Sequence, residues 1–148
     1  MWFWATAVIL STLSLTWVQA ASGSGGNPTA LAALQTKAEQ AEPRDRCFLY
    51  AKLVSQMTDL AGQQLHAGDL ERASETLKLV AEYAEKIHMG VADNSKKIKD
   101  AEVLMQSTSF RLKDILGEAS YEDRQALQAT LKQLDQVQAQ LMMQVFRQ

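Results

Sequence analysis

The sequence has few of the residues that interrupt helices or carry reactive chemistry. It contains one cysteine, two prolines and two histidines in 148 residues, and after residue 28 proline occurs only at position 43. A single cysteine excludes an intrachain disulfide. β-Branched residues never alternate with polar ones over a run, so strands have little support. What remains is rich in Ala, Leu, Gln, Glu and Lys, which favour helix because they lose little rotamer freedom there.

The chain also lacks an excess of either charge. Its net charge is −2, with acidic and basic residues interspersed. Nucleic-acid-binding domains usually carry a strong basic excess, so we expect no nucleic-acid partner. The only basic patch is Lys96, Lys97 and Lys99, and lysines this close together on a helix are typical of a solvated face. An anionic partner at this patch is the less favoured interpretation.

The one long apolar run lies at the N-terminus. Residues 2–18 carry no charge, and Val18-Gln19-Ala20 places small or medium residues where a signal peptidase reads them. We predict a signal peptide over 1–20, cleaved after Ala20, then a flexible linker over 21–28. The protein would then be periplasmic or extracellular. No Lys or Arg precedes the run, and the alternative is an uncleaved anchor, for which the run is at the lower limit of length.

The rest of the chain, 29–148, reads as one helical domain. Asn27 and Pro28 favour the start of a short helix, which Pro43 ends. A second helix is expected over about 44–67, with Gly68 as its stop. Its apolar face is wider than a two-helix seam needs, so we expect neighbours on two sides of it.

The segment 70–116 has the strictest periodicity. Apolar residues recur at alternating steps of three and four, and only Asn94 and Thr108 interrupt the series. Two helices joined by a loop need not share one register, so the pattern predicts a single helix, roughly 70 Å long at 1.5 Å per residue. The alternative interpretation breaks it near Gly90, where helix propensity is poor.

Short connections make consecutive helices antiparallel. Gly117 is expected to end the long helix, and a last helix is expected from near Ser120 to the C-terminus. The predicted fold is therefore all-α, with antiparallel hairpins that share one central helix over 70–116. Because each half would be only two helices thick, this arrangement is compatible with a homodimer. If the central helix breaks near Gly90, the same segments can close into a four-helix bundle.

Residues 57–85 resemble a single tetratricopeptide-type helical hairpin. Ala61 and Ala73 stand where that family places the small residues through which its two helices approach. The large apolar and turn positions match as well: Leu60, Leu77 and Gly68-Asp69. Three positions depart from the family pattern, which usually has an aromatic, an alanine and a proline there: Gln64, Val80 and Glu85. The resemblance covers one unit, whereas such repeats usually need three or more, and it implies protein binding only weakly.

Two residues are the low-ranking candidates for reactive chemistry. Folding the hairpin about Gly68 places residue 88 opposite residue 48, so His88 can approach Cys47. A Cys–His pair can bind a metal or activate a thiolate, but spacing identifies no third ligand. We favour Cys47 as a small apolar side chain of the core, with an intermolecular disulfide as the alternative. We expect no catalytic residue, metal or cofactor.

Two functional classes remain. The favoured one is a non-enzymatic exported protein that acts through protein contacts, as an adaptor, scaffold or chaperone-like module, with a protein partner or a second copy. Its interaction face is predicted on the second helix and at the polar break in the long stripe: Phe48, Leu49, Leu53, Met57 and Asn94. The alternative is a small-molecule or metal-binding bundle with a cavity lined by Met57, Tyr83 and Met105. A break near Gly90 would favour this alternative, because a closed bundle can enclose a ligand.

Overall fold

The computed structural model describes residues 27–89 and 95–147, and for 88, 89, 95 and 96 it describes the backbone alone. Within these ranges the chain forms five α-helices and no strand: α1 (Pro28–Gln40), α2 (Pro43–His66), α3 (Leu70–Met89), α4 (Ser95–Glu118) and α5 (Tyr121–Arg147). The all-α prediction is confirmed. The predicted leader, Gly90 and Asn94 lie outside the described residues.

The helix boundaries follow local chemistry. Asn27 Oδ1 accepts a hydrogen bond from the Thr29 amide at 3.1 Å, so it caps α1, and Pro28 is the first residue of that helix. Between α2 and α3, Gly68 has a φ of 77°, the left-handed conformation that glycine adopts most easily. The Oδ1 of Asp69 then caps α3 by accepting from the Arg72 amide at 3.4 Å.

The prediction that Gly117 ends a helix is wrong by two residues. Helix α4 continues through Gly117 to Glu118. Among the described glycines only Gly68 has positive φ, so Gly117 keeps a helical backbone. The chain turns instead just before Ser120, whose Oγ bonds to Asp123 Oδ2 in the first turn of α5.

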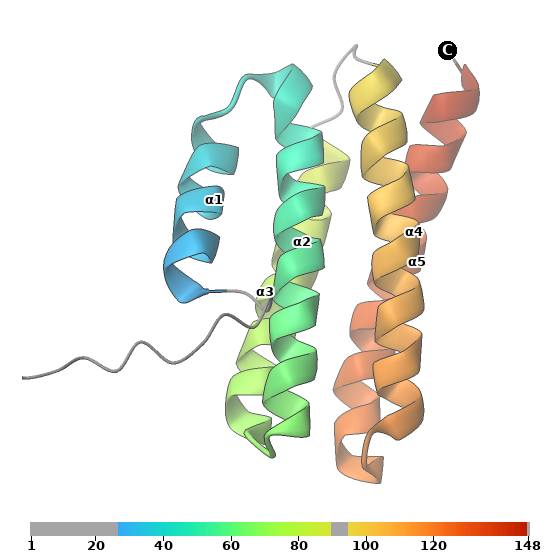
Figure 1. The fold of residues 1–148 in the computed structure, drawn as a ribbon. Helices are drawn as coiled ribbons and strands as arrows, with labels where there is room; N and C mark the ends of the chain where they lie inside the picture. Colours follow the sequence, from blue (N-terminus) through green and yellow to red (C-terminus); the bar gives the residue numbers. More distant parts are fainter. Residues whose placement is uncertain (1–26, 90–94, 148) are drawn as a thin grey trace, which may run out of the picture.

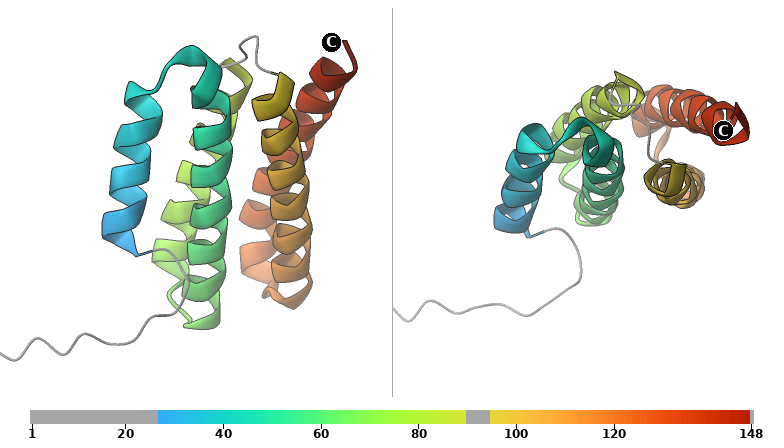
Figure 2. Two further views of the ribbon diagram at one scale, coloured as in Figure 1. Left: turned by 45° about the horizontal axis from the view of Figure 1, so that its top comes forward. Right: turned by 90° about the horizontal axis from the view of Figure 1, so that it is seen from above.

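Helices α2–α5 form a four-helix bundle, with α1 packed on the outer side of α2 (Figure 1). The pairs α2–α3 and α4–α5 are antiparallel hairpins. One hairpin packs on the other, with α2 beside α4 and α3 beside α5. Seen from above, the four helices stand at the corners of a rectangle, and α3 and α4 occupy opposite corners (Figure 2).

Helices α2 and α4 run parallel to each other. Three side-chain contacts advance in the same direction along both: Asp45 with Lys97, Asp59 with Arg111, and His66 with Glu118. This seam has a close approach near its lower end. A Cβ added to Gly62 would lie 2.9 Å from Cδ1 of Ile115, so the absence of a side chain at 62 brings the two helices together.

The predicted single helix over 70–116 is wrong. Helix α3 ends at Met89, α4 begins at Ser95, and α2 packs along both of them. One straight helix of that length would carry its second half away from α2. The shared register is explained without continuity, because every helix of a bundle has its own stripe with steps of three and four. The four-helix bundle, the alternative interpretation, is the arrangement observed.

Closure of the bundle covers the broad face of α2. Helix α3 packs on one side of it and α4 on another, as the width of the face predicted. The buried core runs the length of all four bundle helices, and its largest fully covered hydrophobic side chains include Leu53, Ile87, Ile98, Met105, Leu112, Leu127, Leu134 and Leu141. Covering four apolar stripes at once outweighs any preference for continuing one helix.

Candidate interaction surface

The predicted interaction face is divided between the core and the surface. Leu53 and Met57 are 1% and 8% exposed and belong to the chain's own core, so we exclude them from the face. Leu49 is partly buried against the same core. Phe48 remains partly exposed at the seam between α2 and α4. Asn94, the fifth predicted residue, lies outside the described residues.

Phe48 lines a groove between α2 and α4. The groove has a volume of about 490 Å³, and its lining is mostly apolar, with charged side chains at its edges: Phe48, Lys52, Asp100, Val103, Leu104 and Ser107. Lys97 Nζ lies 5.1 Å from the centroid of the Phe48 ring and 4.0 Å from Asp45 Oδ1. This cation therefore contacts both the ring and a carboxylate and helps to hold the ring at the α2/α4 groove.

Beside the groove, two large apolar side chains project from α4 into solvent. Val103 is 61% exposed and Phe110 is 59% exposed. The residues two positions before and after each of them are buried, so both point away from the core. They lie seven residues apart, two helical turns, on one side of the helix. We call this side the outer face of α4, made of Lys99, Val103, Ser107, Phe110 and Asp114.

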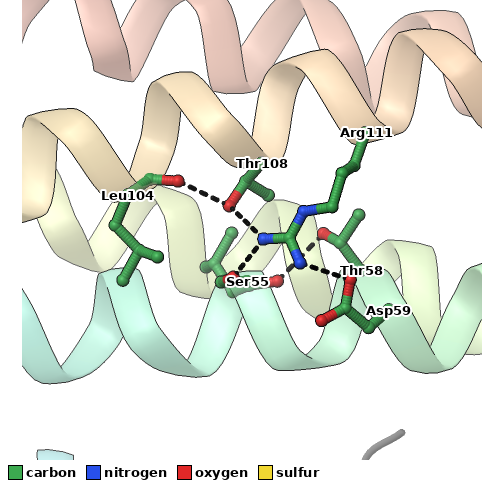
Figure 3. Close-up of polar contacts among 7 residues, drawn as sticks. Ser55, Thr58, Asp59, Leu104, Thr108 and Arg111 are labelled. Atoms are coloured by element: carbon green, nitrogen blue, oxygen red, sulfur yellow. Dashed lines mark hydrogen bonds and ion pairs between the residues drawn. The ribbon is translucent and has the colours of Figure 1, made fainter. Parts of the chain in front are cut away.

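Below the groove, Arg111 links α4 to α2 (Figure 3). Its Nη1 donates to Asp59 Oδ1 at 2.6 Å, and its Nη2 donates to the Ser55 hydroxyl and, at 3.4 Å, to Thr108 Oγ1. Sequence reasoning missed this network. The signal for it in the sequence was Thr108, a polar residue in the apolar stripe. Its hydroxyl also donates to the carbonyl of Leu104 in its own helix. The guanidinium fixes the register of α2 against α4. Both of its Nη atoms donate hydrogen bonds within the chain, whereas its Nε is buried and has no hydrogen-bond partner among the described residues.

Of the two reactive candidates, the structure describes only the side chain of Cys47. Cys47 is 1% exposed, and burial raises the pKa of its thiol to about 11, so the nucleophilic thiolate is scarce at neutral pH. An intermolecular disulfide would require this thiol to leave the core. The side chain of His88 lies outside the described residues. Among the side chains that the structure does describe, no three His, Cys, Asp or Glu residues are grouped as a metal would require.

A second aromatic group joins α2 to α3. The rings of Tyr50 and Tyr83 stack with centroids 6.0 Å apart, and Lys86 Nζ lies 4.8 Å from the Tyr83 centroid. Desolvation raises the pKa of Tyr83, and the nearby Glu39 carboxylate of α1 raises it further. Both rings are buried, so we interpret this group as packing between the helices.

None of the described helices is both long and apolar enough to cross a lipid bilayer. Comparison of the chain with known protein families, with curated proteins and with solved structures finds no match.

Proposed function

We propose that the protein is a non-enzymatic, exported helical module that works through protein contacts at the outer face of α4 and the adjoining α2/α4 groove. The observation that carries the proposal is the exposure of Val103 and Phe110 beside that groove. Single exposed apolar residues are common on protein surfaces. Here Val103 lines an apolar hollow together with the partly exposed ring of Phe48, and Phe110 lies two turns further along the same side of α4. Such continuity is typical of a contact surface.

The exposed side chains of Val103 and Phe110 are not needed to hold the bundle together. Helix α4 already buries a complete inner stripe, with Ile98, Met105 and Leu112 in the core. Val103 and Phe110 lie on its opposite side and add little to that core. Covering them would remove apolar surface from water, worth about 25 cal/mol per Å². A rigid helix that presents apolar side chains next to a groove can accept an amphipathic helix of another chain.

Export rests on the apolar run at 2–18 and the small residues that end at Ala20. An oxidising compartment suits a chain whose one thiol is buried, since Cys47 is then protected from oxidation and exchange. We place the protein in the periplasm or outside the cell. The intact mass of the protein, purified after expression with its own N-terminal residues, tests this: a chain beginning at Ala21 is expected.

Site-specific photo-crosslinking tests the contact surface. A photoreactive phenylalanine derivative replaces Phe110 in the full chain, and in a control it replaces Tyr121, which is 90% exposed at the start of α5. We expect a discrete protein adduct from position 110 and none from position 121. Val103→Glu in the same chain should abolish the adduct, because it places a charge at the centre of the surface.

Two results would contradict the proposal. One is the absence of any discrete adduct at position 110. The other is an adduct that persists unchanged with Val103→Glu, because the contact would then not depend on the outer face of α4. Circular dichroism of each variant should remain that of the parent, since both positions point away from the core.

A second candidate is a ligand-binding bundle, and the closed four-helix arrangement is the observation that favours it. Its predicted lining residues, Met57, Tyr83 and Met105, are 8%, 6% and 0% exposed and form part of the packed core. A ligand would therefore have to displace or extend that packing. Native mass spectrometry of the exported protein tests this candidate, because a bound small molecule or metal would add its mass to the chain.

A further inference from the structure

We propose that a second copy of this chain occupies the outer face of α4, in an antiparallel α4–α4 contact with a two-fold axis between residues 106 and 107. This inference rests on the proposed function and names the partner of the same surface. In such a pair, residue i of one copy lies opposite residue 213 − i of the other. Val103 then lies opposite Phe110 of the second copy. Because of the two-fold axis, this apolar contact forms twice.

Charge complementarity supports this arrangement. Lys99 and Asp114 flank the apolar pair at the two ends of the outer face, four residues beyond Val103 and Phe110 respectively. Their numbers also sum to 213, so the antiparallel contact places each lysine opposite the carboxylate of the second copy. Both side chains are exposed, and within the described part of the chain neither has an ion-pair partner. Two-fold symmetry forms the ion pair twice.

The same charges disfavour the other simple arrangement. A parallel α4–α4 contact would set Lys99 against Lys99 and Asp114 against Asp114, and like charges in register repel. It would also leave Phe110 opposite Phe110 and Val103 opposite Val103, with unequal volumes along the seam. Isologous two-fold contact is the commonest symmetry of protein dimers, and it needs a self-complementary surface such as this one.

The centre of the contact is compatible with close helix packing. Ser107 lies on the outer face between Val103 and Phe110, and in this register it faces Gln106 of the second copy, so one of the two side chains at the centre is small. Small side chains at the crossing point let two helices approach. Lys113, beside the face, is engaged in its own chain, with Nζ 5.6 Å from the Phe110 ring centroid and 3.7 Å from Asp135 Oδ1. It therefore braces the ring from the α5 side.

Charge reversal in separate chains tests the proposal. The full chain is purified after expression with its own N-terminal residues, and its self-association is measured by sedimentation equilibrium into the high micromolar range. Lys99→Glu and Asp114→Lys are each expected to weaken the dimer about tenfold, because each replaces two attractions by two repulsions. An equal mixture of the two variants should form heterodimers nearly as tight as the parent. In that heterodimer the introduced glutamate of one chain faces the introduced lysine of the other, and the unchanged Asp114 faces the unchanged Lys99.

Lys78→Glu is the matched control. It makes the same change of net charge as Lys99→Glu at an exposed position on α3, away from α4, and should leave the dimer unchanged. A chain that is monomeric at every concentration overturns the proposal, and so does dimer formation that neither reversal weakens. Weakened variants that fail to associate with each other also overturn it, since Lys99 and Asp114 would then not be opposed.

The crosslink at position 110 separates this proposal from the proposed function. An adduct with the mass of two copies supports both. An adduct to a different protein, together with a monomeric purified chain, overturns the second copy as the occupant and leaves the surface intact. No adduct at all contradicts both.

Discussion

Arg111 connects two parallel helices through one guanidinium. It reaches from α4 to Asp59 and Ser55 on α2, and all three groups sit at a partly covered seam. Parallel neighbours in this bundle have no tight turn between them to fix their relative height. A forked, charge-assisted hydrogen-bond donor that contacts two α2 residues four positions apart can supply that register.

Asp59→Ala should therefore destabilise the protein by about 1 kcal/mol. The substitution removes a short ion pair and leaves the Arg111 guanidinium partly buried without that partner. The expected loss of stability is modest because about a third of each side chain is exposed to solvent. Urea unfolding followed by circular dichroism measures the change.

Asp135→Ala is the matched comparison at the antiparallel seam. Its contact with Lys113 is longer, 3.7 Å, and both side chains are nearly half exposed. It should change the free energy of unfolding by less than about 0.5 kcal/mol. Equal losses in the free energy of unfolding for the two alanine variants would show that the Arg111–Asp59 contact is an ordinary surface ion pair.

Gly68 and Gly117 show how one residue type takes two roles at the level of the element. The sequence assigned both as helix stops, because glycine at the end of a periodic run usually is one. Gly68 fulfils this with a φ of 77°, whereas Gly117 remains helical one residue before α4 ends. The spacing of apolar residues cannot distinguish the two cases, because both glycines follow the last apolar position of their helix.

Alanine at these two glycines should act in opposite directions. Gly117→Ala should raise the free energy of unfolding by about 0.5–1 kcal/mol, since its Cβ meets no atom within 4 Å and helix propensity improves. Gly68→Ala should lower it by about 1 kcal/mol, because alanine is strained at positive φ. Thermal and urea denaturation of both variants measures the difference. A stabilised Gly68→Ala would mean that the turn does not need a left-handed residue.

At the scale of the whole molecule, the decisive fact is that α4 returns to lie beside α2. A disulfide across that seam tests it. In a Cys47→Ala background, Gly62→Cys with Ile115→Cys should oxidise to an intrachain disulfide, because a Cβ at 62 lies 3.5 Å from Cγ1 of Ile115, the position that a cysteine sulfur would take. In a continuous helix, residue 115 would lie roughly 70 Å along the rod from the hairpin turn, at 1.5 Å per residue.

The control pairs Gly62→Cys with Val103→Cys, which lies twelve residues, about 18 Å, along α4 from position 115. Mild oxidation followed by free-thiol titration and non-reducing electrophoresis distinguishes the two chains. Loss of both thiols in the 62/115 chain alone confirms the bundle. Equal oxidation of both pairs would point to a mobile α4, and oxidation of neither would reject the parallel seam.

The sequence by itself determined the all-α class and several local features of the helices. Capping at Asn27, the turn at Gly68 and the width of the apolar face of α2 are local properties, and the structure agrees with each. These features depend on backbone geometry within a few residues, which is why they can be read without knowing what packs where.

Only the tertiary structure decided that residues 70–116 form two helices at opposite corners of a bundle. Periodicity records the phase of one helix and carries no information about where the next one turns. It also could not separate Leu53 and Met57, now in the core, from Phe48, which stays at the surface seam. Which apolar side chains are covered depends on which helices meet, and the free energy gained by burying α4 against α2 settles that choice.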